Sequence, residues 1–304
     1  MVSTTRTAIA WGTAVLLTIG LTSCASDLGS DNSGDGQSLT VGSQTGFVNQ
    51  VVAQLYGQAL DSRGYDVDYN PGVGTRKTFL ASLQDGSIDV IPDFAGSLLS
   101  TVSASSDATS TEAIMDSLPI ALDSLELTVL DAAPATKTRA FVVTKAFAEA
   151  HSITTIADLA PIAPATTIGS AEQMELSAYG RDALEYTYNI SGWMYRSEPD
   201  AKTVVEDLLD NTIQVADLST IDPAIEDEDL VVLKDPDGLI TAQNVVPIVS
   251  DAVLTTDITV ILNAVSAELS NHDLGQFASD HSRLPATVAH DWLIAHDLIV
   301  DADS

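Results

Sequence analysis

Cys24, the only cysteine in the 304-residue chain, directly follows an apolar segment near the N-terminus. Arg6 precedes this segment, which runs from Ala8 to Leu21 and ends in Leu-Thr-Ser-Cys. It is shorter than the roughly 20 apolar residues of a membrane-spanning helix, and small residues flank the expected cleavage site. The pattern predicts a lipoprotein signal peptide over residues 1–23 and a thioether to diacylglycerol on Cys24. The alternative is a secreted protein that is cut nearby and keeps a free thiol.

The sequence lacks the residue patterns of common catalytic and metal sites. It has no Gly-x-Ser-x-Gly, no His-Glu-x-x-His, no phosphate-binding loop, and no Cys and His at metal-ligand spacing. Acidic residues are so frequent that a pair of carboxylates is no evidence for acid–base catalysis. We therefore expect no catalytic residue, no metal and no cofactor. The alternatives of another class are an extracytoplasmic hydrolase that uses two carboxylates, and a sensory or scaffold lipoprotein.

The chain is strongly acidic, with 43 Asp and Glu against 12 Lys and Arg and a net charge of -31. Binding to a phosphate backbone needs clustered cations, so nucleic acid is excluded as a partner. The acidic residues are spread without long blocks, which is typical of a solvated surface. Residues 24–38 are rich in Gly, Ser, Asp and Asn, and this composition predicts a flexible tether between a membrane and a folded domain.

After the tether, short apolar runs alternate with helical patterns. Strands are expected at residues 39–41, 67–69 and 88–91; a helix spans Val48–Ala59 and another begins after a cap at Thr75. This order implies parallel strands joined by right-handed crossovers, and hence an α/β fold. Ligands of such sheets bind beyond the carboxyl ends of the strands, which here are the segments 42–46, 72–75 and 92–96.

A second unit of the same kind is expected from about Thr138. Its pattern predicts strands at residues 140–143, 167–168, 213–215 and 231–233, with helices around Ala157, Ala183 and Val204. A later strand at residues 244–249 precedes two helices, one carrying Ile258 to Leu269 and one carrying Val288 to Leu293. No internal sequence repeat accompanies the second unit.

Three stretches share their order and spacing with one known family. They are Val41-Gly-Ser-Gln-Thr-Gly-Phe-Val-Asn-Gln50, the segment Gly72–Gly96 with its Ile-Asp-Val-Ile-Pro-Asp-Phe-Ala-Gly ending, and Asp235–Val249. With them the chain resembles the substrate-binding proteins of glycine betaine, choline and related quaternary-ammonium importers of the ATP-binding-cassette (ABC) class. The resemblance extends over residues 39–300.

The resemblance implies a two-lobed, type II periplasmic-binding-protein fold with the ligand cleft between the lobes. Two α/β lobes would be joined by two crossing strands: lobe 1 over residues 39–134 plus 242–304, and lobe 2 over residues 135–241. It also implies an extracytoplasmic protein that delivers a small molecule to an ABC permease and its ATPase, here while anchored to the membrane by the lipid on Cys24.

The site implied by the resemblance is altered in this chain. A quaternary ammonium group forms no hydrogen bonds, so proteins hold it by cation–π attraction, which the family supplies with several tyrosines. Phe94 keeps an aromatic ring after the third strand, but Arg139 and Leu218 stand where second-lobe tyrosines are expected. Arg139 would repel a bare cation and could clamp a carboxylate, since Ser177 replaces a family arginine. A surface arginine on an edge strand is the alternative.

Polar loop residues complete the predicted ligand site. They are Gln44, Thr45, Gly74, Thr75 and Arg76, for which ordinary turn chemistry is the alternative. Tyr179, Trp193 and Tyr195 could replace the missing rings or belong to the core. A betaine carries both a cation and a carboxylate, so we expect a quaternary-ammonium, betaine-like osmolyte as the ligand. An amino-acid-like or otherwise anionic solute is the alternative within this class.

Overall fold

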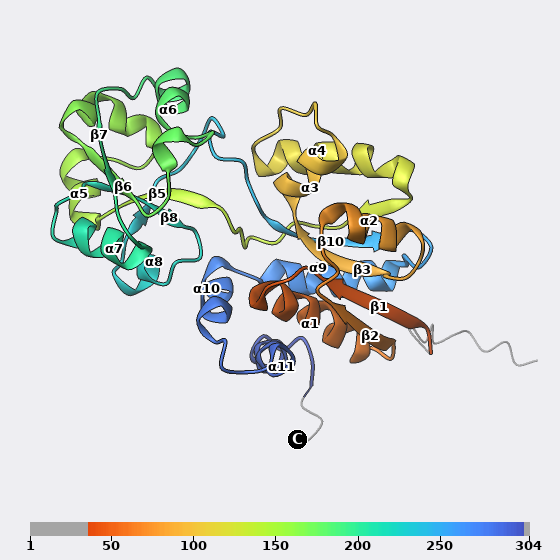
Figure 1. Ribbon diagram of the computed structural model, residues 1–304. Helices are drawn as coiled ribbons and strands as arrows, with labels where there is room; N and C mark the ends of the chain where they lie inside the picture. The colour runs from red at the N-terminus through yellow and green to blue at the C-terminus, as the bar shows by residue number, and fades with distance from the viewer. Residues whose placement is uncertain (1–35, 301–304) are drawn as a thin grey trace, which may run out of the picture. The chain divides into compact units, whose positions relative to one another are not determined.

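Two mixed β-sheets form from the short apolar segments of the sequence, and helices cover both faces of each sheet in the computed structural model (Figure 1). The structure describes residues 36–300. The predicted signal peptide, Cys24 and most of the predicted tether therefore lie outside the described residues. Among residues 36–300 we find no helix with the length and apolar character needed to cross a membrane.

The first sheet has the strand order β2-β1-β3-β10-β4. Its strands are β1 (Ser38–Ser43), β2 (Asp66–Pro71), β3 (Val90–Phe94), β4 (Leu127–Val129) and β10 (Val245–Ser250). The expected parallel pairing is confirmed for β1 with β2 and for β1 with β3. β10 runs antiparallel to both β3 and β4, because the chain enters it directly from the second sheet without a crossover helix.

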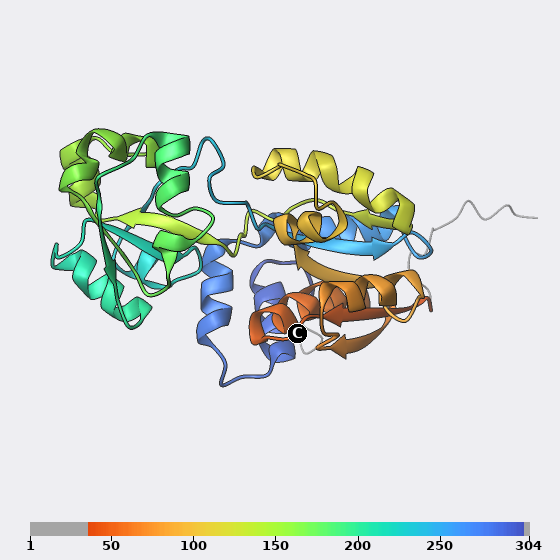
Figure 2. The same cartoon turned by 45° about the horizontal axis from the view of Figure 1, so that its top comes forward.

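The apolar residues of β10 alternate between two cores, one on each face of the first sheet. Val245 and Val249 pack with one cluster, which α1, α9, α10 and α11 complete. Val246 and Ile248 pack with the other, which α2, α3 and α4 complete. Figures 1 and 2 show these helices on the two sides of the sheet. This two-sided burial explains why β10 has no exposed residue.

The second sheet has the order β7-β6-β8-β5-β9, which repeats the topology of the first. Its strands are β5 (Arg139–Val143), β6 (Thr167–Ser170), β7 (Met194–Ser197), β8 (Val215–Ser219) and β9 (Val231–Val232). β6 pairs in parallel with β7 and β8, whereas β5 is antiparallel to β8 and β9. The topology is therefore duplicated although the sequence shows no repeat.

The helices have the following bounds. Around the first sheet are α1 (Phe47–Asp61), α2 (Arg76–Gln84), α3 (Ala95–Val102), α4 (Thr111–Leu122), η1 (Asp123–Leu125), α9 (Thr256–Glu268), α10 (Asn271–Ser279) and α11 (Pro285–Ala295). Around the second are α5 (Lys145–His151), η2 (Ile156–Ala165), η3 (Met174–Leu176), α6 (Arg181–Tyr188), α7 (Ala201–Leu209) and α8 (Ala224–Asp227). The helix expected around Ala157 is the 3-10 helix η2, which contains Pro161 and Pro164.

Two extended segments connect the sheets and pair with each other. Thr136 forms an antiparallel bridge with Asn244, and the backbone N–H of Lys137 donates to the carbonyl of Gln243 at 3.1 Å. These are two crossing segments of the kind that the family resemblance implies.

Two expected strands are wrong at their ends. The strand predicted at residues 213–215 begins at Val215 and continues to Ser219. The strand predicted at residues 88–91 begins at Val90 and continues to Phe94. The backbone N–H of Ile88 donates to the carbonyl of Ser82 near the end of α2, so Ile88 still belongs to the turn after that helix. The shift places Asp93 inside the strand, at its carboxyl end.

Candidate functional site

A buried carboxylate, that of Asp93, lies at the carboxyl end of β3 and organises the polar residues of the first lobe, by which we mean the first sheet with its helices. Arg76 donates to it twice, from Nε to Oδ2 at 2.8 Å and from Nη2 to Oδ1 at 3.0 Å. Gln44 donates to Oδ1 from its Nε2 at 2.5 Å. Two of the predicted ligand-binding residues are thus brought together, but on a carboxylate of the protein.

Local structure explains how these side chains meet. β1 and β3 are neighbouring parallel strands, so Gln44, just after β1, lies beside the end of β3. Arg76 is the first residue of α2, and the side chain of Thr75 caps that helix by accepting from Thr78, as predicted. Gly74 has φ 94°, a backbone conformation that favours glycine and turns the chain into the cap.

The electrostatics of Asp93 follow from its burial. Loss of water raises the pKa of its carboxyl group, and the hydrogen bonds and positive charge of Arg76 oppose that rise. The Arg76 side chain is 25% exposed, whereas the Asp93 side chain is buried. Arg76 therefore exposes one edge of its guanidinium, and the buried Asp93 carboxylate largely balances the positive charge of that group.

The second lobe, which is the second sheet with its helices, contains an equivalent pair. Arg139, at the start of β5, donates from Nε to Asp217 Oδ1 at 3.0 Å, and its Nη2 lies 2.9 Å from Asp217 Oδ2. Ser170 donates to the same carboxylate at 2.7 Å, and Glu172 lies 3.3 Å from Arg139 Nη1. Burial raises the pKa of Asp217, and the bonds from Arg139 oppose the rise. The guanidinium predicted to clamp a ligand carboxylate is therefore held by two carboxylates of the protein.

Asp93 and Asp217 were missed by sequence reasoning. β3 and β8 occupy the same place in the two sheets, so both carboxylates stand at equivalent positions. The available signal was an acidic residue inside an apolar strand, as in Ile-Pro-Asp-Phe and Val-Ala-Asp-Leu. Such a residue is buried almost only when it is paired.

Phe94 lies next to Asp93 and is half-buried at the end of β3. One part of the ring packs against the core of the first lobe. The ammonium of Lys137 lies 5.8 Å from the ring centroid, within the range of cation–π attraction. A cation of the protein itself therefore occupies the aromatic surface that the sequence predicted for a ligand.

The remaining predicted residues lie in different environments. Thr45 is exposed, and its backbone carbonyl accepts a hydrogen bond from Asn49. Gly74 is exposed as well. Leu218 is 1% exposed and packs in the core with α7 and α8, because it faces the side of β8 opposite to Asp217. Its side chain is therefore not available to a ligand in this structure.

The aromatic residues considered as replacement rings divide into two groups. Tyr179 lies near the Arg139–Asp217 pair, and burial raises its pKa to about 12. The hydroxyl of Tyr195 donates to the carbonyl of Glu172 beside the same pair. Trp193 is buried in the core, and the guanidinium of Arg181 covers its ring at 4.1 Å. Tyr179 and Tyr195 therefore border the polar cluster, whereas Trp193 supports the core.

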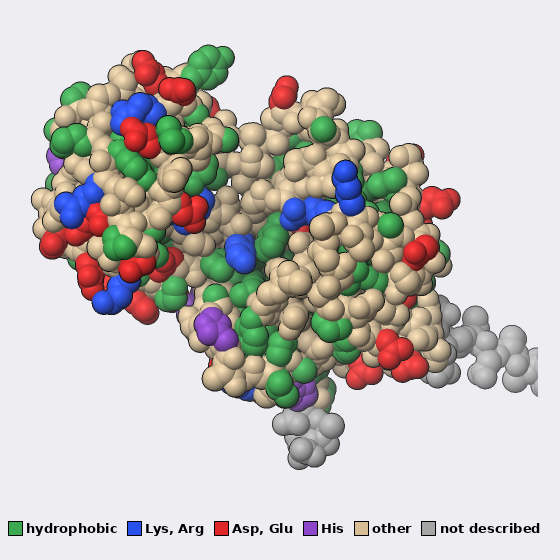
Figure 3. All heavy atoms as spheres, in the orientation of Figure 1, with side chains coloured by type: hydrophobic (Ala, Val, Ile, Leu, Met, Phe, Trp, Pro, Cys, Tyr) green, Lys and Arg blue, Asp and Glu red, His purple; other side chains and the backbone are tan. Residues whose placement is uncertain are grey.

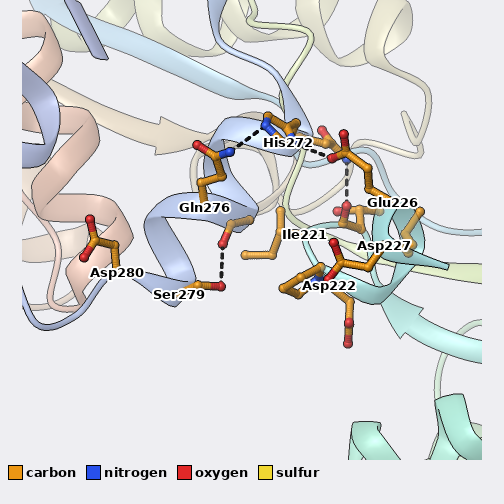
Figure 4. Close-up of a pocket in the computed structure, with 13 residues that line it drawn as sticks. Ile221, Asp222, Glu226, Asp227, His272, Gln276, Ser279 and Asp280 are labelled. Atoms are coloured by element: carbon orange, nitrogen blue, oxygen red, sulfur yellow. Dashed lines mark hydrogen bonds and ion pairs between the residues drawn. The ribbon is translucent and has the colours of Figure 1, made fainter. Parts of the chain in front are cut away.

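One pocket, of about 620 Å³, contains none of the predicted ligand-binding residues. It lies between α8 and α10 and is walled by Asp222, Glu226, Asp227 and Asp280 (Figure 4). A contact between Glu226 and His272 crosses one end of it. Its lining offers neither an aromatic cage nor a free cation, so the strand ends remain the better candidate for ligand binding.

The surface charge agrees with the acidic composition. Figure 3 shows acidic side chains spread over the visible face and interrupted by Lys and Arg. Within the described part of the chain, no cluster of three or more His, Cys, Asp or Glu is arranged to hold a metal ion.

Comparison with known families identifies the chain. The family of substrate-binding domains of ABC-type glycine betaine transport systems matches residues 37–295. The chain belongs to this family. Members of the family are solute-binding components of transport systems and not enzymes. The two-lobed fold and the order of the three sequence stretches are thereby explained by common descent.

Solved structures of similar proteins agree with the fold. One is a glycine betaine/carnitine/choline ABC transporter protein, 18% identical, with a TM-score of 0.74 over 86% of this chain and 99% of that one. Another is apo YehZ from Escherichia coli, 21% identical, with a TM-score of 0.70 over 86% of this chain and 99% of that one. At these identities the likeness shows the fold alone. Comparison with curated proteins gives no match.

Proposed function

We propose that the protein is an extracytoplasmic solute-binding protein of an ABC importer, anchored by a lipid on Cys24, which delivers a small betaine-like osmolyte to a permease and ATPase. The family match over residues 37–295 carries this proposal. The lipobox at Leu21–Cys24 supports the anchor. On this proposal the protein catalyses no reaction and needs no cofactor.

The ligand site proposed here is formed by the strand ends of both lobes. In the first lobe it comprises Gln44, Thr45, Gly74, Thr75, Arg76 and Phe94. In the second lobe it comprises Arg139 with its neighbours Tyr179 and Tyr195, whereas Leu218 is left out because of its burial. The proposal keeps the lobe boundaries at 39–134 plus 242–304 and 135–241, and the division of the strands between two sheets supports a division into two lobes.

An amino-acid-like or otherwise anionic solute is the second candidate ligand. It is favoured by one observation, the Lys137 ammonium near the ring of Phe94. A carboxylate can approach that ammonium, whereas a cation without a carboxylate meets like charge.

Thermal unfolding of the purified protein with candidate solutes tests the proposal. A solute that binds only the folded state raises the melting temperature by mass action. Glycine betaine, carnitine, choline and a panel of amino acids would be compared at concentrations from micromolar to millimolar. A rise with glycine betaine or carnitine supports a betaine-like ligand, whereas a rise with amino acids alone supports the second candidate. No rise with any of them contradicts both.

An enzymatic function makes a different prediction. A hydrolase would consume its ligand, so the solute recovered after long incubation would be chemically changed. A binding protein returns the solute unchanged after denaturation. Mass spectrometry of the recovered solute separates the two, and a permease and an ATPase encoded beside this protein would support transport.

A further inference from the structure

Lys137 is positioned by a backbone ladder that also contains Phe94. Phe94 pairs with Val245 across antiparallel β3 and β10. Two residues before Val245, the carbonyl of Gln243 accepts the backbone N–H of Lys137. This backbone bond places Lys137 close to the ring, and its ammonium nitrogen lies 5.8 Å from the ring centroid.

The charge of Lys137 differs from that of the two nearby arginines. Arg76 and Arg139 are neutralised by the buried Asp93 and Asp217. No carboxylate within residues 36–300 lies at ion-pair distance from Lys137, whose side chain is exposed. Of these three cations, Lys137 is therefore the one whose charge a ligand can use.

The position over the ring gives Lys137 two opposite effects on ligands. A carboxylate-free cation must displace the ammonium from Phe94 and receives like-charge repulsion from it. A zwitterion places its own cationic head on the ring, while its carboxylate binds the displaced ammonium in a charge-assisted hydrogen bond. An anionic solute binds the ammonium directly.

We propose that Lys137 is a specificity-determining residue that selects carboxylate-bearing solutes, zwitterionic or anionic, over cations without a carboxylate. The inference rests on the proposed function and assigns to Lys137 the part that the sequence suggested for Arg139. Phe94 is then a ring shared between the lysine of the protein and the head group of the ligand.

Matched ligand pairs test the inference. Dissociation constants of the purified protein would be measured by calorimetry for glycine betaine and its methyl ester, and for L-proline and L-prolinamide. The members of each pair differ in the charge of the carboxyl group. For Lys137→Met, we expect the ratio of the ester or amide Kd to the carboxylate Kd to fall about tenfold, because one charge-assisted bond and one repulsion are removed together.

Two further variants separate charge from structure. Lys137→Arg keeps the positive charge. Its ratio of ester or amide Kd to carboxylate Kd is expected to stay within about threefold of the ratio for the unaltered protein. Lys145→Met removes an exposed lysine that pairs with Asp229 on the second lobe, and is expected to leave the ratio unchanged. If Lys137→Met changes the Kd of both members of a pair by the same factor, Lys137 does not discriminate, and the proposed function still stands. If the unaltered protein binds no member of either pair, the proposed ligand class falls and this inference falls with it.

Discussion

Arg139 and Asp217 form a two-contact ion pair across β5 and β8, with N–O distances of 3.0 and 2.9 Å. The Asp217 side chain is fully buried, while that of Arg139 is 22% exposed. Replacing Arg139 with Ala leaves a buried carboxylate without its counter-charge. We expect Arg139→Ala to lower the free energy of unfolding by about 3 kcal/mol, measured by urea denaturation.

The double variant Arg139→Ala with Asp217→Ala removes both charges and is expected to recover part of that loss. The ligand-clamp hypothesis predicts something else. It requires a folded Arg139→Ala variant of unchanged stability whose affinity for a carboxylate-bearing ligand is weaker by about 2 to 4 kcal/mol, with affinity for a carboxylate-free analogue retained. That outcome would assign the guanidinium to the ligand instead of to Asp217.

The raised pKa of Asp93 predicts a pH dependence of stability. Burial raises its pKa in the folded protein above the unfolded value of about 3.9, so the folded state holds the proton more tightly. Its contribution to stability therefore falls as the pH rises from the unfolded pKa through the folded one. Asp93→Asn cannot titrate. The free energy of unfolding of the unaltered protein minus that of Asp93→Asn is expected to decrease as the pH rises from about 4.5 to 7.

Asp85 provides the matched control for this experiment. It is exposed, and hydrogen bonds from Ser87 lower its pKa, so its contribution is present above the unfolded pKa and is lost on acidification. The corresponding difference for Asp85→Asn is expected not to decrease over the same interval. A difference for Asp93→Asn that increases with pH would show that Arg76 outweighs burial.

Phe94→Ala tests the surviving ring of the aromatic cage. Loss of one cation–π partner is expected to weaken a quaternary-ammonium ligand by about 1 to 2 kcal/mol, or roughly five- to thirtyfold in Kd. Phe147→Ala, which removes a partly buried ring from α5, serves as the control and should not change the Kd. An unchanged Kd in a folded Phe94→Ala variant would show that the family's use of this ring has not been retained.

Cys24→Ser tests the lipid anchor, which lies outside the described residues. The serine cannot form the thioether, so we expect the variant to leave the membrane fraction and to bind its ligand with unchanged affinity. Ser26→Ala, two residues further along the chain, should remain in the membrane fraction. Cell fractionation followed by immunoblotting measures both variants, and membrane retention of Cys24→Ser would contradict the lipoprotein assignment.

The sequence determined the elements whose patterns are local. The alternation of apolar residues identified β1 and β2, and a continuous apolar run identified β5. The helical spacing from Val48 to Ala59 identified α1. The cap at Thr75 was also predicted, because a capping hydroxyl acts within three residues of itself. The family followed from the order of three short stretches, and its match over residues 37–295 confirms it.

Partners distant in the sequence were decided only by the tertiary structure. Arg76 and Asp93 are 17 residues apart and meet because the start of α2 lies beside the end of β3. Arg139 and Asp217 are 78 residues apart and meet because β5 and β8 are neighbouring strands. No local pattern encodes the distance between such residues. The prediction for Arg139 considered its charge without Asp217. Both faces of β8 are buried, and Leu218 faces the core formed with α7 and α8. Lys137 reaches Phe94 because two segments about a hundred residues apart pair at the crossing, a contact created by folding and not by sequence spacing.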